Sequence, residues 1–422
     1  MLATSGYENA KIFADNKIVN AKIVPLITQG LFSQIYKVQF FNENPEKPFF
    51  TTIIKKPTTE KFDGMAGEGG FDVNLVKSFH NNECKFYQMF TGNIHKFLPK
   101  PKLFSYRKFE EGSDENGFIL MEDLSERTKV YDVLESMSQE QVEAVVDSLA
   151  VFHNDILIYE SEFWQNKFNN CAYITIHNIV MPEMTEQTLN KLKQLRPGVF
   201  DDLLKKLHRM IYETELVQFC VTGCCEEIGK KYGFDDLLKK LHRMIYETEL
   251  VQFCVTGCCE EIGVPLVICH GDVWNNNILW YTNEDGSVSN RLAAFIDYHY
   301  ACQGNPAYDF TRMIVFGCDP DVRHEIEETI FDFYMQKLTA YMGEHDEKPN
   351  FMAEQLKKAY GYSLCHMAWL CCLHAIFYPT NQTDALDKEA LEKLQEKLVL
   401  RAKAALEDAV KFLKKEKPEW LL

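Results

Sequence analysis

The order of hydrophobic and polar positions divides the chain into a strand-rich first part and a largely helical remainder. Residues 22–28, 34–41 and 49–55 are short segments rich in β-branched and aromatic side chains, and polar turn-like stretches separate them, which is typical of strands. A helix is expected around 75–90, and residues 117–121 form a further short apolar run. The pattern therefore predicts a β-rich N-terminal region.

Helical spacing dominates the rest of the chain. Ser138 followed by Gln141 predicts a capping box, and behind it apolar residues recur at helical intervals: Val142, Val145, Val146 and Leu149. Residues 321–413 also read as helical. Strand character returns only at 264–269 and 292–296, on either side of a polar loop.

Two domains of an α+β fold follow from this change of pattern. Residues 1–124 would form a small β-rich domain, and residues 125–422 a larger, mainly helical one.

The second domain contains a tandem duplication. Residues 200–229 and 234–263 are identical at every position, with an offset of 34 residues. The offset matches a tetratricopeptide repeat, but the Trp, Gly and Pro pattern of that repeat is absent, so a helical-repeat interaction protein is the weakest alternative. A recent duplication or a gene-model artefact fits better. We expect the second copy to fill the helix position before the strand at 264–269, and the first copy to be an additional, less buried helix.

Composition narrows the class of protein. With 422 residues, 46% of them hydrophobic, the chain can bury a large core. Its net charge of -17 argues against nucleic acid or an anionic membrane as the main partner. The most apolar stretch, 364–378, is shorter than the ~20 residues that span a bilayer, so it predicts a core helix and no membrane span. Unpatterned cysteines without a visible secretion signal indicate a cytoplasmic protein.

The polar loop from His270 to Asn277 carries the candidate chemistry. Phosphoryl transfer requires a carboxylate that orients or deprotonates the acceptor hydroxyl, and oxygen ligands that hold Mg²⁺ on the phosphates. Asp272 can serve as the base. Asn277 and, twenty residues later, Asp297 can serve as metal ligands, because Mg²⁺ prefers oxygen donors.

These residues resemble a known signature. His270-Gly271-Asp272 with Asn277, followed by Ile-Asp, resembles the motif of the aminoglycoside phosphotransferase and choline kinase group, and Trp274 makes it similar to the CHK kinase-like branch that includes ecdysteroid kinases. The resemblance implies a protein-kinase-like, two-lobed fold that uses ATP and Mg²⁺ to phosphorylate a small-molecule hydroxyl acceptor. It also implies that His270 and Asp309 support the catalytic loop.

The N-terminal half resembles the same group more loosely. The resemblance implies that Lys55 holds the ATP phosphates and pairs with Glu83. It implies that Glu122 and Leu124 belong to the hinge that meets adenine, and that Gly30 lies in the phosphate loop.

Two departures keep a second function open. Gly30 is the single glycine of the expected phosphate loop, and His299 stands where relatives carry Gln or Glu. The alternative to an active kinase is a catalytically inactive pseudokinase that serves as a nucleotide-binding or scaffold module. The complete set of candidate residues favours the active enzyme. The acceptor stays open among steroid-like, choline-like and aminoglycoside-like alcohols.

Overall fold

The structure is a computed structural model that combines a β-rich part with a helical part, which confirms the predicted mixed α+β class. It describes residues 17–26, 32–44, 46–58, 73–90, 98–110, 112, 115–158, 163–169, 251–380 and 386–421.

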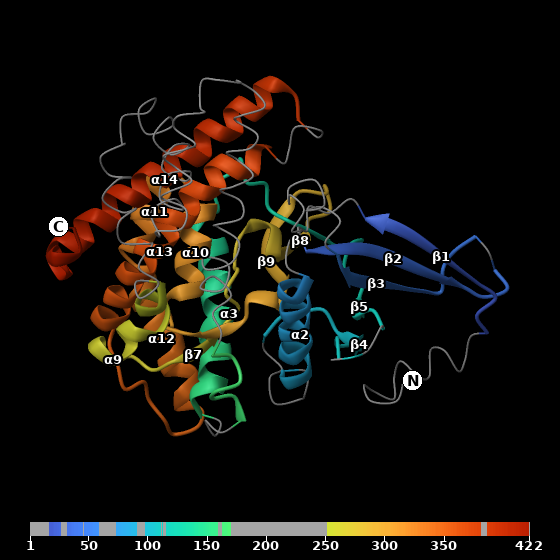
Figure 1. Cartoon of the computed structure of the whole chain (residues 1–422), viewed down its shortest axis with the longest axis horizontal. Helices are drawn as coiled ribbons and strands as arrows, with labels where there is room; N and C mark the ends of the chain where they lie inside the picture. The colour runs from blue at the N-terminus through green and yellow to red at the C-terminus, as the bar shows by residue number, and fades with distance from the viewer. Residues whose placement is uncertain are drawn as a thin grey trace. The chain divides into compact units, whose positions relative to one another are not determined.

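The chain forms two compact units (Figure 1). We call them the N-terminal unit, which comprises Met1–Lys129, Leu279–Ser289 and Ala293–Tyr300, and the C-terminal unit, which comprises Val130–Ile278, Asn290–Leu292 and Ala301–Leu422. The domain boundary expected after residue 124 stays a prediction. The first boundary between the units lies after Lys129. The later segments Leu279–Ser289 and Ala293–Tyr300 also belong to the N-terminal unit.

An antiparallel sheet with the strand order β1-β2-β3-β5-β4 forms the centre of the N-terminal unit. Its strands are β1 Asn20–Leu26, β2 Ser33–Phe41, β3 Phe50–Pro57, β4 Leu103–Arg107 and β5 Phe118–Glu122. Four of them confirm the predicted strands, whereas β4 was not expected. A second sheet has the order β6-β8-β9, from Thr128–Lys129, Ile278–Thr282 and Val288–Phe295.

Helix α2, Val73–Met89, packs near β3 and β4 in this unit (Figure 1). Its buried residues fall at intervals of three and four: Leu75, Val76, Phe79, His80, Glu83, Cys84, Phe86 and Tyr87. This spacing defines one face of a helix. Glu83 lies within that face, so the local pattern carries a carboxylate into the interior.

The C-terminal unit is mainly helical. Its elements are α3 Gln139–Ile158, η4 Phe253–Gly257, α9 Cys258–Ile262, β7 Val267–Cys269, η5 Asn275–Asn277, β10 Cys302–Gly304, α10 Tyr308–Gly317, α11 Pro320–Glu327, α12 Ile330–Gly343, α13 Ala353–Thr380, α14 Lys388–Glu416 and η7 Pro418–Leu421. A short 3-10 turn, η6 Tyr298–Tyr300, belongs to the N-terminal unit. The predicted capping box is confirmed, since Gln141 N–H donates to Ser138 Oγ at 3.3 Å and Ser138 N–H donates to Gln141 Oε1 at 3.0 Å.

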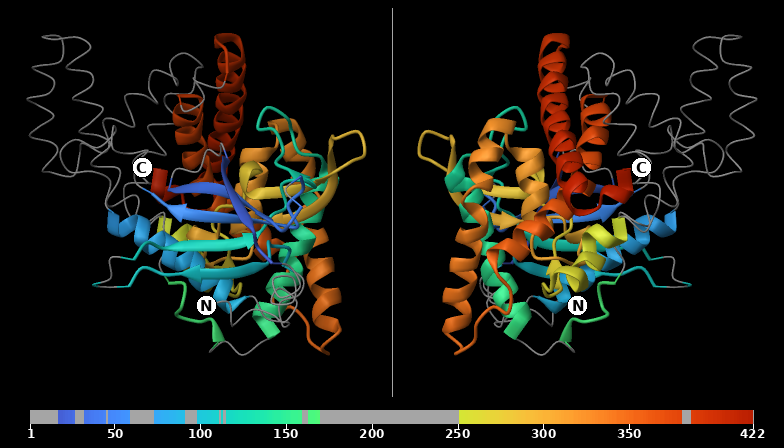
Figure 2. Two further views of the ribbon diagram at one scale, coloured as in Figure 1. Left: turned by 90° about the vertical axis from the view of Figure 1, so that its right-hand side faces the viewer. Right: turned by 90° about the vertical axis from the view of Figure 1, so that its left-hand side faces the viewer.

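The long helices α13 and α14 lie side by side at the C-terminal end of the chain (Figure 2). The predicted core helix at 364–378 is part of α13, and its residues from Leu364 to Trp369 are buried. Helix α14 begins at the N-cap Asp387, whose side chain accepts from Ala390 N–H at 2.9 Å; such a cap contributes about 1 kcal/mol. Among the described residues, no helix has both the length and the apolar character needed to cross a bilayer.

The end of the second duplicated copy is integrated into the C-terminal unit. Cys254, Val255 and Cys258 are fully buried, and Gly263 ends α9 in the left-handed region with φ of 70°. The Val255 carbonyl accepts from Asn305 N–H at 2.8 Å. The first copy and the beginning of the second, as well as the expected difference in burial between them, lie outside the described residues.

Candidate active site

Strand β7 leads directly into the catalytic-loop candidate, whose backbone is fixed by one carboxylate. Asp309, in the first turn of α10, accepts from His270 N–H at 2.6 Å and from Gly271 N–H at 2.9 Å. Burial raises the pKa of Asp309 to about 7, against the lowering effect of these two backbone bonds. Gly271 has φ of 84°, a region that other residues rarely adopt, which explains a glycine at this position. His270 Nδ1 accepts from Asp272 N–H at 3.2 Å.

Both carboxylate oxygens of Asp272 have partners. Arg312 Nη2 lies 2.5 Å from Asp272 Oδ1, and Asn277 Nδ2 donates to Oδ2 at 2.8 Å. Asp272 and Asn277 are buried within the same loop. The amide nitrogen of Asn277 is used in this bond, so its amide oxygen is the atom that suits a hard cation.

Arg312 is the residue of this site that sequence reasoning missed. It lies three residues after Asp309 on α10, so both side chains share one helix face. Its guanidinium also packs over the ring of Phe316, at 4.4 Å from the centroid. The i, i+3 spacing from the expected Asp309 was the available signal.

The N-terminal unit contains a second set of charged residues, centred on Lys55 of β3. The expected ion pair is present, with Lys55 Nζ at 2.6 Å from Glu83 Oε2, and Lys55 also pairs with Asp297 Oδ1. Lys55 is 7% exposed and Glu83 is 1% exposed, so both charges are removed from water. A buried lysine with two carboxylate partners carries a desolvation cost, and removal of one partner would leave an uncompensated buried charge.

The charges in this set determine one another's ionisation. Burial alone would lower the pKa of Lys55, but the carboxylates of Asp297 and Glu83 outweigh it and raise the value. Burial raises the pKa of Glu83, against the opposing charge of Lys55. Burial also acts to raise the pKa of Asp297, but the charges of His299 and Lys55 hold it well below its usual range. The set therefore contains a permanent ammonium group and an ionised Asp297.

Asp297 follows the end of β9 and has a constrained backbone. Among the described residues, it is one of three residues other than glycine with positive φ, at 71°. His299 Nδ1 lies 2.5 Å from Asp297 Oδ1, and its ring contacts Phe32 and Phe79. The unusual His299 thus acts on Asp297 directly. The positive φ of Asp297 persists only when the surrounding residues hold the backbone in place.

The remaining nucleotide-site candidates are placed only in part. Glu122 ends β5, and its N–H donates to the Lys102 carbonyl at 2.8 Å. The carbonyl of the buried Leu124 accepts from Arg127 N–H at 3.1 Å and from Thr128 Oγ1 at 2.8 Å. Their contact with adenine stays a prediction. Gly30 lies outside the described residues.

The other side chains of the loop pack within the C-terminal unit. Trp274 is half-buried and makes edge contacts with the rings of His374 and Tyr378, at 5.2 and 5.8 Å. Trp274 therefore packs against residues of α13. Asn275 is fully buried and donates to the Asp132 carbonyl at 3.3 Å.

The chain belongs to a defined protein family. A family model described as "Uncharacterized oxidoreductase dhs-27" (DUF1679) matches residues 50–239 and again residues 226–417, which together make up most of the chain. The two matches overlap at residues 226–239, at the junction of the two duplicated copies. This is the pattern expected if the chain holds one 34-residue unit more than the family model.

Two curated relatives come from Caenorhabditis elegans. "Uncharacterized oxidoreductase dhs-27" is 25% identical over 365 residues, which are 83% of this chain and 39% of that protein. "Uncharacterized kinase-like protein D1044.1" is 22% identical over 355 residues, 82% of this chain and 80% of that protein. The chain therefore spans well under half the length of the first relative and most of the second.

Similar solved structures include two phosphotransferases. A putative aminoglycoside phosphotransferase from Ralstonia eutropha has 12% identity and a TM-score of 0.43, with 96% of this chain and 97% of that chain covered. The GDP and kanamycin complex of APH(2")-IIia has 12% identity and a TM-score of 0.41, with 93% and 98% covered. These low values assign no function to this chain, so its function is inferred from its own residues.

Proposed function

We propose that the protein is an ATP- and Mg²⁺-dependent phosphotransferase that phosphorylates a hydroxyl group of a small metabolite. The observation that carries the proposal is Asp272, a buried carboxylate whose two oxygens are held by Arg312 and Asn277. A carboxylate fixed in this way beside a potential magnesium ligand suits phosphoryl transfer, in which positioning does most of the work. The kinase-like name of D1044.1 is consistent with it.

Each residue of the two sets has a role in this reaction. Lys55, oriented by Glu83, binds the phosphates as a fixed cation. Asn277 and Asp297 offer the oxygen donors that Mg²⁺ prefers, and the bound ion would neutralise phosphate charge. Asp272 accepts the proton of the acceptor hydroxyl as that oxygen bonds to the γ-phosphorus, and the bond to the β–γ bridging oxygen breaks, which releases ADP.

The proposal also assigns roles to the hinge and to the residues that support the loop, and it assigns a cellular compartment. Glu122 and Leu124 would meet adenine through backbone groups, Gly30 would lie over the phosphates, and His270 and Asp309 hold the loop backbone in place. We assign the reaction to the cytoplasm because the described cysteines are free thiols, which a reducing compartment preserves. The candidate acceptors are steroid-like, choline-like and aminoglycoside-like alcohols.

A pseudokinase is the second candidate, and His299 is the observation that favours it. Its ring nitrogen and Lys55 Nζ both contact Oδ1 of Asp297, the carboxylate that would help to hold a magnesium ion. A protein that keeps these contacts when nucleotide is bound would hold the nucleotide without metal and without turnover.

A metabolite screen tests the proposal. The protein is incubated with ATP, Mg²⁺ and a cell extract, and products heavier by one phosphoryl group are sought by mass spectrometry. An active phosphotransferase gives a product that is absent with the Asp272→Asn variant. Nucleotide binding that is independent of Mg²⁺, without any product, would establish the pseudokinase instead.

A further inference from the structure

We infer that Arg401, on the C-terminal helix α14, is a positioning residue for the catalytic loop. The inference deepens the proposed function and rests on it for its effect on activity. Arg401 is 2% exposed. Its hydrogen bonds go to Val133, Glu135, Phe316 and Asp319, none of which is a candidate catalytic residue. Its action therefore depends on the segment that it holds, Tyr131–Met137, which we call the clasp segment.

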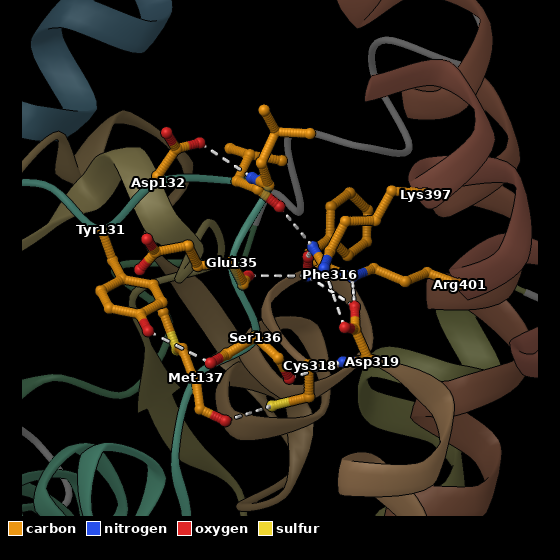
Figure 3. A network of polar contacts seen from close by, with 12 residues as sticks. Tyr131, Asp132, Glu135, Ser136, Met137, Phe316, Cys318, Asp319, Lys397 and Arg401 are labelled. Atoms are coloured by element: carbon orange, nitrogen blue, oxygen red, sulfur yellow. Dashed lines mark hydrogen bonds and ion pairs between the residues drawn. The ribbon is translucent and has the colours of Figure 1, made fainter. Parts of the chain in front are cut away.

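The guanidinium of Arg401 uses all three of its nitrogens (Figure 3). Nη1 donates to the carbonyls of Val133 at 2.9 Å and Phe316 at 2.7 Å, and Nη2 donates to the carbonyl of Glu135 at 2.8 Å. Nε and Nη2 lie 3.1 and 3.0 Å from Asp319 Oδ1. The planar fork of arginine suits several fixed acceptors, which the single ammonium group of lysine cannot match.

The clasp segment is also held to the end of α10. Met137 N–H donates to the Gly317 carbonyl, and Asp319 N–H donates to Ser136 Oγ, each at 2.9 Å. Lys397 of α14 binds the second oxygen of Asp319 at 2.8 Å (Figure 3). Two residues of α14 thus neutralise the carboxylate beside the segment. The segment is fixed by α10 and α14 together.

The clasp segment touches the catalytic loop at Asn275. The Asn275 amide donates to the Asp132 carbonyl, directly before Val133, to which Arg401 binds. A Cβ placed on Gly317 would come within 3.0 Å of Asn275 Oδ1, so the loop packs tightly against the end of α10 as well. Asn275 lies two residues before Asn277, and movement of the clasp segment would therefore reach the Asp272–Asn277 pair.

A second series of contacts connects Arg401 with Asp272 through α10. Arg401 binds the Phe316 carbonyl, and the Phe316 ring packs under Arg312, whose guanidinium meets Asp272. Both contacts depend on the position of backbone carbonyls, which Arg401 fixes. Arg401 thus influences the orientation of Asp272 without touching it.

Arg323 provides a matched control. It is also an arginine that is 2% exposed, and it links α11 to α14 through Asp408, with Glu327 as its second partner at 2.7 Å. Neither partner belongs to the clasp segment or to the catalytic loop. Lysine variants at the two positions therefore disturb burial and charge to a similar degree, but only one of them loosens the loop.

Hydrogen–deuterium exchange of the loop 270–277 tests the inference without any need for activity. Arg401→Lys should speed exchange of these amides about tenfold or more, because hydrogen bonds to a charged group are lost. Arg323→Lys should leave the exchange within about twofold of wild type, the scatter expected for a distant site. Equal exchange in the two variants would overturn the inference.

Kinetics give the second readout. Arg401→Lys should lower kcat about tenfold with an unchanged KM for nucleotide, and Asn275→Ala should act in the same direction. The double variant should lose less than the product of the two single losses, because both act on one contact. A loss equal to that product contradicts the inference. If the wild-type protein transfers no phosphoryl group, the proposed function fails, while the exchange experiment still decides the role of Arg401.

Discussion

At the scale of single residues, Lys55 shows how charge defines the N-terminal half of the site. Its ammonium is buried between Glu83 and Asp297, whose charges raise its pKa against the effect of burial. Removing the cation leaves carboxylates without compensation in a region of low dielectric constant. Its neighbour Lys56 is exposed and serves as a comparison.

Lys55→Met should destabilise the protein by about 3 kcal/mol, the lower end of the cost of breaking a buried pair. The variant Lys56→Met should change stability by less than about 0.5 kcal/mol. Adding Glu83→Gln to Lys55→Met should restore part of the loss, because the amide carries no charge. Urea denaturation measures all three. Equal stabilities of the two methionine variants would show that Lys55 is not a buried ion partner.

In the C-terminal unit, Arg312 fixes the orientation of the Asp272 carboxylate through an ion pair. Arg312→Met should lower kcat by about tenfold or more, because Asp272 loses the partner that fixes one of its oxygens. Arg312→Lys should retain more activity, since its ammonium can reach one carboxylate oxygen. The measurement is the steady-state rate with the acceptor from the metabolite screen. Unchanged turnover in the methionine variant would show that Arg312 does not contribute to catalysis.

The sequence pointed to candidate residues but not to all of their partners. Asp272, Asn277 and Asp297 stand at fixed spacings in one stretch, and that spacing was sufficient to select them. The contact of Arg312 with Asp272 joins residues forty positions apart, so it depends on how α10 meets the loop. The i, i+3 spacing of Arg312 from Asp309 is the local signal, and it does not identify Asp272 as the partner.

At the scale of elements, α3 shows how a buried polar contact links two helices. His153 of α3 is fully buried, and its Nδ1 lies 2.8 Å from the hydroxyl of Tyr334 on α12. Burial lowers the pKa of His153 to about 3, from an ordinary value of 6.5. The folded protein therefore holds this imidazole neutral in conditions where the unfolded chain would protonate it.

The contribution of His153 to stability is complete above pH 6.5 and is lost as the pH falls from 6.5 towards 3. The loss approaches about 1.4 kcal/mol for each pH unit. His153→Gln should make the unfolding free energy less dependent on pH in this window, as measured by urea denaturation at several pH values. The control is His345→Gln, the same substitution at an exposed position, and comparison of the two slopes isolates the effect of burial. An unaltered slope in His153→Gln would show that His153 titrates normally.

Elements with a strong local signal were predicted, and those defined by pairing were not. The capping box of α3 and strands β1, β2 and β3 follow from residue type and periodicity. Strand β4 has a mixed polar sequence, and it is a strand because β5 supplies its hydrogen bonds. Strand β8 was missed although Asp285-Gly286, with Gly286 at φ of 81°, marked the turn into β9.

At the scale of the whole molecule, the duplicated segment is where the two matches of the family model meet. The family model matches twice, and the two matches overlap at 226–239, at the junction of the two copies. The described end of the second copy, Val251–Gly263, continues into β7 and the candidate catalytic loop. One copy is therefore enough to supply the residues that precede the site.

Deletion of residues 200–233 should leave a cooperatively folding protein, because the remaining copy is identical in sequence. Its Tm should stay within about 3 °C of the full chain, a difference of less than about 1 kcal/mol. Deletion of both copies, residues 200–263, should abolish folding, since it removes the buried Cys254, Val255 and Cys258. Calorimetry of the two proteins decides. Unfolding of the single deletion would show that both copies are required.

The most direct test of the central claim compares binding and transfer in one variant, Asp272→Asn. The change keeps the size of the side chain and removes the base. Transfer of labelled γ-phosphate from ATP to the acceptor should fall ~10²-fold or more. Affinity for Mg²⁺-ATP, measured by calorimetry, should change by less than about threefold, well under 1 kcal/mol. Loss of transfer with binding retained is the result that the account predicts. Near-normal transfer by Asp272→Asn would contradict it.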